Sequence, residues 1–232
     1  MNFISKLAKF NPSKNILNSI RNVSTSNYLK DVQDNNKQSN CCPPCPPCSM
    51  YFKEVECKVN EQIALEFVAF YNYLGIFNHF GRSDIALNGC KHFFLKCAEE
   101  EKKHALKLCN YQNMRGGTVN LMDVEKPIKS FCTVKDAFIY SLQMEKKITE
   151  KLIDLKNVAK KCDDCVTHDL IVNEFIKHQY KSIQSLNGYL KKLELLKDNC
   201  SGIYHFDKEL QENFDVSRAL ILHLEKRNRH VV

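Results

Sequence analysis

The chain has 232 residues, of which 44% are apolar and 26% are charged, values that are ordinary for a globular protein. Seven glycines and six prolines are too few for a turn-rich all-β fold, and the sequence contains no run of 18 apolar residues that would predict a transmembrane helix. The net charge of +7 is concentrated in the first 30 residues, so the remainder is nearly neutral and gives no reason to expect a nucleic-acid or membrane partner.

The N-terminal segment, residues 1–30, contains five lysines and arginines and neither Asp nor Glu. Large apolar residues recur in it at helical spacing, beginning with Phe3 and Leu7. A basic, acid-free amphipathic segment is typical of mitochondrial transit peptides, and Arg21 lies where a matrix protease would cut nearby. We therefore predict that residues 1–23 are a transit peptide to the mitochondrial matrix. The alternative is a basic tail on a cytoplasmic protein.

Residues 24–50 are poor in large apolar side chains and rich in Ser, Asn, Gln, Pro and Cys, which predicts a disordered arm. The arm contains the run Cys41-Cys42-Pro-Pro-Cys45-Pro-Pro-Cys48. In a polyproline II helix, with three residues per turn, three of these thiols would share one face. Capture of a soft metal, thiol cross-linking and acylation all fit this pattern, as does a low-complexity arm with incidental thiols.

From about residue 53 the apolar residues follow the helical period. Long helices are predicted at about 53–80, 84–114, 134–160 and 168–196, and a short one at about 203–212. Ser83 is a candidate N-cap for the second helix, and Thr133 with Asp136 resembles a capping box for the third. One long connection, between the second and third helices, predicts an all-α four-helix bundle with a single crossover and a short fifth helix. Residues 213–232 are predicted to form a C-terminal tail.

Each of the four long helices places a polar side chain where its apolar stripe requires a core residue. These residues are Glu66, Glu101, His104, Glu145 and Gln179. An isolated buried carboxylate is costly, so three of them on three helices predict a cation between them. Glu101 and His104, at i and i+3, share one helix face, a motif that diiron carboxylate bundles use, and carboxylate with imidazole suits Fe(II). An exposed Glu–His pair is the plain alternative for this motif alone.

The sequence resembles a ferritin of the eukaryotic heavy-chain type over about residues 53–212. The matching segments are Asn60-x-Gln62-Ile63-x-Leu65-Glu66 with Tyr73, Glu99-Glu-Glu101-Lys-Lys-His104-Ala105, Tyr111-Gln-Asn-x-Arg115-Gly-Gly117, Met144-Glu145-Lys146, Gln179 with Lys181 and Ile183, and Tyr204-x-Phe206-Asp207-Lys208. The resemblance implies a ferritin-like diiron domain over residues 51–212. It also implies a hollow shell of 24 subunits, either homomeric or mixed with other ferritin chains, that stores iron as ferric mineral.

The resemblance further implies ferroxidase activity, the oxidation of Fe(II) by dioxygen with two iron ions at each subunit's site. Carried over by position, that site consists of Glu66, Tyr73, Glu101, His104, Glu145 and Gln179. Glu101 would bridge the two irons, Glu66 and His104 would complete the first, and Glu145 would bind the second with support from Gln179. Tyr73 would orient a ligand or donate an electron.

The sequence departs from the ferritin pattern where inner-surface and pore carboxylates are expected. Lys103 and Leu106 replace acidic residues beyond the oxidation site, and Val172 replaces the pore glutamate next to the retained Asp169. His168, with Asp169, is a weaker candidate for a metal site at a three-fold pore, where Cys162-x-x-Cys165 lies just before. A surface turn with two reduced thiols is the alternative.

Three functional hypotheses follow. The first is a mitochondrial heavy-type ferritin that oxidises and stores iron. The second is a mainly structural or regulatory subunit that assembles with other ferritin chains, which the changes at Lys103 and Val172 favour. The third is a thiol-based metal chaperone, which rests on residues 41–48 alone.

Overall fold

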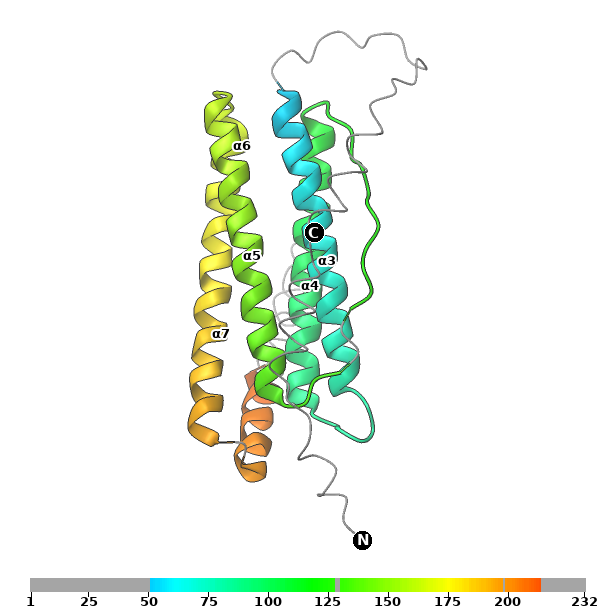
Figure 1. Cartoon of the computed structure of the whole chain (residues 1–232), viewed down its shortest axis with the longest axis vertical. Coiled ribbons are helices and arrows are strands. Elements are labelled where there is room, and N and C mark those ends of the chain that lie inside the picture. Colours follow the sequence, from blue (N-terminus) through cyan, green and yellow to red (C-terminus); the bar gives the residue numbers. More distant parts are fainter. Residues whose placement is uncertain (1–50, 128–129, 198, 214–232) are drawn as a thin grey trace, which may run out of the picture. The chain divides into compact units, whose positions relative to one another are not determined.

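The computed structural model describes residues 51–127, 130–197 and 199–213, within a compact unit spanning Cys48–Val232. All regular secondary structure in these ranges is helical (Figure 1). The helices are α3 (Lys53–Phe80), α4 (Asn88–Met114), α5 (Val134–Lys161), α6 (Cys165–Leu170), the π-helix η2 (Ile171–Ile176), α7 (Lys177–Leu196) and a fifth helix at residues 200–213. The predictions for residues 1–23 and 24–50, and for the tail beyond residue 213, lie outside the described residues.

The long helices form the predicted all-α bundle. Helix α3 packs along α4 and α5, and α5 packs along the segment α6–η2–α7 (Figure 1). An aliphatic cluster that includes Val59, Leu108 and Leu152 fills one end, while Phe94 and Phe138 belong to an aromatic cluster toward the other. The middle of the bundle therefore lies between two apolar clusters, one toward each end. None of the helices in the described part of the chain has the length and apolar character needed to cross a membrane.

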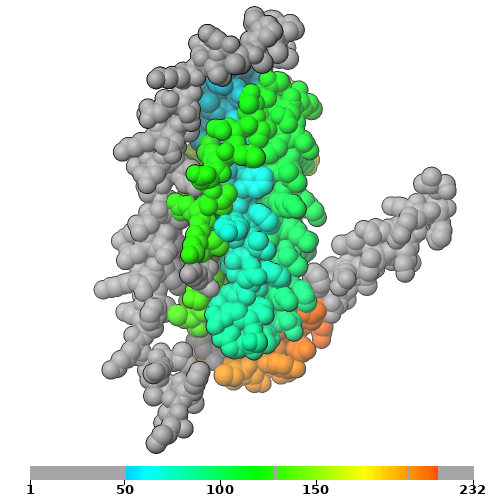
Figure 2. Space-filling view, turned by 90° about the vertical axis from the view of Figure 1, so that its right-hand side faces the viewer, coloured from blue at the N-terminus to red at the C-terminus, as the bar shows by residue number. Residues whose placement is uncertain are grey.

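The crossover between α4 and α5 begins by lying on α3 (Figure 2). Asn60 donates from Nδ2 to the carbonyl of Thr118 (2.9 Å) and accepts from the backbone N–H of Asn120 (2.9 Å). Gln112, on α4, donates from Nε2 to the carbonyl of Glu56 (3.0 Å), and its Oε1 accepts from the hydroxyl of Tyr51. Asn60 thus satisfies two backbone groups that the irregular crossover cannot pair by itself, while Gln112 ties the end of α4 to the start of α3.

The predicted capping box at the start of α5 is confirmed. The hydroxyl of Thr133 accepts from the Asp136 N–H (3.0 Å), and the Asp136 carboxylate accepts from the Thr133 N–H (3.1 Å). We expect Thr133→Ala to lower the free energy of unfolding by about 1 kcal/mol, because the N–H of Asp136 loses its acceptor, the Thr133 hydroxyl. Urea denaturation measures this change, and Thr133→Ser, which keeps the hydroxyl, serves as the control. Equal stability of all three proteins would contradict it.

The predicted start of the second helix at Ser83 is wrong. Helix α4 begins at Asn88, and a turn precedes it in which the backbone N–H of Ala86 donates to the carbonyl of Arg82 (2.8 Å). No side chain at the preceding residue caps α4. Instead, the carboxylate of Asp207, from the fifth helix, accepts from the N–H of Cys90 (2.8 Å). A negative charge at this position also interacts favourably with the helix dipole.

The fourth long helix begins earlier than predicted and is not uniformly α-helical. Asp164 caps α6 by accepting from the N–H of Thr167 (3.0 Å), and Asp163, with φ of 53°, makes the sharp turn before it. Arg115, at the end of α4, donates to the Asp164 carboxylate (2.9 Å). The single predicted helix at 168–196 is therefore a continuous run of α6, η2 and α7 that starts at Cys165 and is tied to α4.

Candidate metal centre

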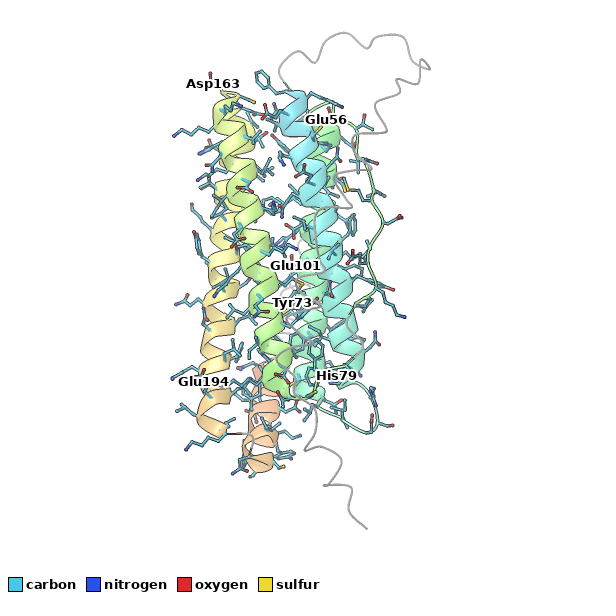
Figure 3. The ribbon with its side chains drawn as sticks, viewed as in Figure 1. Glu56, Tyr73, His79, Glu101, Asp163 and Glu194 are labelled. Atoms are coloured by element: carbon cyan, nitrogen blue, oxygen red, sulfur yellow. The ribbon has the colours of Figure 1, made fainter. Side chains whose placement is uncertain are left out.

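Three ligand-bearing side chains meet in the middle of the bundle. The ligand atoms of Glu66 on α3, and of Glu101 and His104 on α4, all lie within 4.8 Å of one another. His104 Nδ1 is 3.1 Å from Glu101 Oε2 and 3.9 Å from Glu66 Oε2. Figure 3 shows the labelled Glu101 and Tyr73 inside the bundle, away from both ends. Glu101 and His104, three residues apart on α4, therefore face a third candidate ligand, Glu66 on α3, as the apolar stripes predict.

Glu145, on α5, forms the second half of the centre. Its Oε1 accepts a hydrogen bond from the hydroxyl of Tyr73, and its Oε2 accepts one from Nε2 of Gln179 on α7. Both neighbours are almost completely buried, as is Glu145 itself. All six predicted site residues are thus brought together, with Glu101 next to the Glu66 side and in electrostatic contact with Glu145.

Burial makes these carboxyl groups hold their protons. Burial first, and the neighbouring Glu101 second, keep the pKa of Glu66 well above its ordinary value. Burial and the charge of Glu145 raise the pKa of Glu101 to about 8, and burial raises the pKa of Glu145 to about 7. The three groups cannot all be ionised together near neutral pH without a compensating cation. Because hard carboxylate oxygens with one imidazole suit Fe(II), the donor set fits iron.

The metal-free chain is expected to lose stability as pH rises. The folded state binds protons at Glu101 and Glu145 more tightly than the unfolded state, whose carboxyl pKa is near 4.5. This contribution is fully present below about pH 4.5 and is lost as pH rises through about 7 to 8. Urea denaturation of the metal-free protein at about pH 5.5 and about pH 8 measures the loss.

The matched control for this pH dependence is Glu145→Gln, which cannot titrate at that position. The difference in unfolding free energy between the two pH values should shrink in this variant, because one of the proton-binding groups is gone. A metal-free wild-type protein that is equally stable at both pH values would contradict the assignment of raised pKa values to the centre.

A cavity of about 270 Å³ adjoins the centre between α4 and α7. Tyr73, Glu101 and Glu145 line its inner part, and the exposed side chains of Lys96 and Lys181 line it toward the surface. Small solutes therefore have a path to an otherwise buried site. The aromatic ring of Tyr73 stacks on Phe94, with centroids 6.1 Å apart, which fixes its hydroxyl toward Glu145.

Two neighbours of the centre were not assigned a role from the sequence. The ring of His178 lies edge-on to that of His104, with centroids 4.7 Å apart. Gln62 donates from Nε2 to Glu66 Oε1 at 2.8 Å. Gln62 had a signal, since it precedes Glu66 by four residues on the same helix face. His178 had none, because it lies beside Gln179 on a different face of its helix.

The two weaker metal candidates lie outside this centre. His168 and Asp169 are on α6, with the His168 Nδ1 and Asp169 Oδ1 atoms 3.2 Å apart, and the Asp169 side chain is 73% exposed. Cys162 and Cys165 are free thiols at the same end of the bundle. A role at a pore requires further copies of the chain, so it stays a prediction.

Comparison with known proteins identifies similar chains. A family model described as "Ferritin-like domain" matches residues 56–196. The chain is 41% identical over 160 residues to a protein of Schistosoma mansoni named Ferritin-1 heavy chain, covering 68% of this chain and 92% of that one. It is 37% identical over 160 residues to the Ferritin heavy chain of Echinococcus granulosus, covering 68% and 92%. It is also 35% identical over 195 residues to Ferritin-2, chloroplastic, of Vigna unguiculata, covering 80% and 78%.

Proposed function

This chain belongs to the ferritin family, and on that premise we propose that it is an iron-storage subunit that oxidises Fe(II) with dioxygen at the centre described above. The observation that carries the proposal is the approach of Glu66, Glu101 and His104 within 4.8 Å, next to the buried Glu145. Heavy-chain relatives at 41% and 37% identity support it.

The residues have distinct roles in this proposal. Glu66 and His104 would hold one Fe(II), Glu145 with Gln179 would hold the other, and Glu101 would contact both. Binding displaces the protons that burial retains on the carboxyl groups. Ionised carboxylates stabilise Fe(III) more than Fe(II), so the site favours loss of one electron from each iron, and dioxygen takes up both electrons. Tyr73 and Gln179 would fix the orientation of Glu145 through their hydrogen bonds.

Oxygen consumption tests the proposal. Metal-free protein, mixed in air-saturated buffer with two Fe(II) per subunit, should consume dioxygen and develop ferric absorbance much faster than Fe(II) in buffer alone. Oxidation at the buffer rate would contradict the proposed activity. The measurement uses the chain without residues 1–23, because we propose that this segment is removed on import into mitochondria.

Fusion of residues 1–30 to a fluorescent reporter tests the proposed import into mitochondria, and a purely cytosolic signal would contradict it.

A mainly structural or regulatory role is the second candidate. It is favoured by the exposed Lys103 and the 47% exposed Leu106 on α4, and by Val172 in η2. A chain in this role would assemble with other ferritin subunits, whereas the first proposal expects a homomeric shell of 24 subunits. Light scattering of the purified chain distinguishes the two. A shell that forms only after a second ferritin chain is added would favour the structural role.

A further inference from the structure

Gln62 is a buried amide whose nitrogen is hydrogen-bonded but whose oxygen is not. Its side chain is 1% exposed, and its Nε2 donates to Glu66 Oε1 at 2.8 Å. Its Oε1 has no hydrogen-bond partner among the residues that the structure describes. A buried carbonyl oxygen that has left water without gaining a partner opposes folding. An apolar side chain of the same size would avoid that cost but would leave Glu66 Oε1 without its donor, so the two effects on stability offset and the contribution of Gln62 must be sought elsewhere.

The one bond that Gln62 makes is to a residue of the metal centre. The two side chains are one helical turn apart on α3, so they lie on the same face. Because Gln62 occupies Glu66 Oε1, the other carboxylate oxygen, Oε2, is the one that faces His104, 3.9 Å from its Nδ1. Within the described ranges, Oε2 of Glu66 has no hydrogen-bond partner, so it is the atom free to bind a cation.

We propose that Gln62 is a positioning residue that holds the Glu66 carboxylate with Oε2 directed at the metal. This inference rests on the proposed iron-oxidising function of the centre. In this role Gln62 acts through Glu66, because the bond that it makes is the donation from Nε2 to Glu66 Oε1. Without this bond, the Glu66 carboxyl group can rotate about its terminal torsion, which is broad, and the ligand is no longer preset. Partners of this kind typically contribute 10–100-fold to metal affinity.

Gln112 provides a matched control elsewhere in the bundle. It is the same residue type and equally buried, but both ends of its amide are satisfied, by the Glu56 carbonyl and the Tyr51 hydroxyl. It contacts the start of the crossover and none of the six residues of the centre. Replacing it leaves buried partners unpaired and should therefore lower stability without affecting the metal site.

The experiment compares Gln62→Met, Gln112→Met and the wild-type chain. Fe(II) is titrated into the metal-free proteins under argon by calorimetry, and urea denaturation is measured without metal. Gln62→Met should weaken binding of the first Fe(II) by about tenfold or more. Its urea midpoint should stay close to that of the wild type, because the variant removes the unpaired Gln62 Oε1 while leaving Glu66 Oε1 without a donor. In Gln112→Met the midpoint should fall and the Fe(II) affinity should be unchanged. At saturating Fe(II), the oxidation rate of Gln62→Met should recover to within about threefold of the wild type.

Each outcome decides one question. If Gln62→Met keeps wild-type Fe(II) affinity, or loses stability as Gln112→Met does, the positioning role is wrong. If Gln62→Met binds weakly and stays slow at saturating Fe(II), Gln62 does more than position a ligand, and the proposal as stated is overturned. A wild-type chain that neither binds nor oxidises Fe(II) would instead refute the proposed function, which separates failure of that premise from failure of the inference.

Discussion

Replacing Glu101 by glutamine is expected to slow Fe(II) oxidation by more than about 100-fold, beyond the usual cost of losing an outer-shell partner. The ligand atoms of Glu101 lie within 4.8 Å of those of Glu66 and His104, and its carboxylate interacts electrostatically with Glu145, so Glu101 interacts with both halves of the centre. Glutamine has the same shape but carries no charge and binds Fe(II) weakly. Rapid mixing of Fe(II) with the aerobic protein, followed by ferric absorbance, measures the loss.

The stability of this variant separates a chemical effect from misfolding. The pKa of Glu101 is raised to about 8 by burial and by Glu145, so above that pH the folded wild-type chain carries a carboxylate that it stabilises poorly. Glutamine removes the charge, and the metal-free variant should be at least as stable as the wild type at alkaline pH. Glu99→Gln, an exposed change two residues earlier on α4, is the control and should oxidise Fe(II) normally. Normal oxidation by Glu101→Gln would show that the centre is assigned to the wrong residues.

The long helices and the centre were predictable because local periodicity determines both. The predicted 53–80 coincides with α3, and the capping box at Thr133 involves residues only three apart. Glu66 and Glu145 interrupt apolar stripes, and a buried carboxylate is costly enough for the interruption to be informative. These polar side chains come together because the apolar stripes of all four long helices face the same core.

The features that sequence reasoning missed depend on contacts between distant segments. The true start of α4 at Asn88 is set by Asp207, which lies 117 residues away from Cys90 along the chain. Ser83 has the right residue type for an N-cap but lies in a turn. The π-helix η2 changes the hydrogen-bond register without changing the apolar pattern, so the period of the sequence does not reveal it. Gln62 lies one helical turn before Glu66, which the sequence shows, but its role follows only from the 2.8 Å hydrogen bond between the two side chains.

The docking of the fifth helix onto α4 leads to the second large prediction. A methyl group added at Gly89 would lie 1.8 Å from the backbone oxygen of Asp207 and 2.8 Å from its carbonyl carbon. These are backbone atoms, so no side-chain rotation relieves the clash, and residues 200–213 must move away. Gly89→Ala is therefore expected to break the bond from Cys90 N–H to Asp207 and to expose Phe206, which is 3% exposed when docked. Overpacking and loss of the cap together should cost about 2 to 4 kcal/mol.

Gly188 is the matched control, since it lies inside α7 and a methyl group there meets no atom within 4 Å. Gly188→Ala should stabilise the chain by up to about 1 kcal/mol, because alanine favours the helix more than glycine does. Urea denaturation of both variants measures these opposite changes, and amide hydrogen exchange over residues 200–213 locates the first. Amide exchange in Gly89→Ala that is faster over residues 200–213 but as slow in α3 as in the wild type would show that the fifth helix has undocked while the bundle persists. Unchanged exchange and stability would mean that Asp207 does not hold this helix against α4.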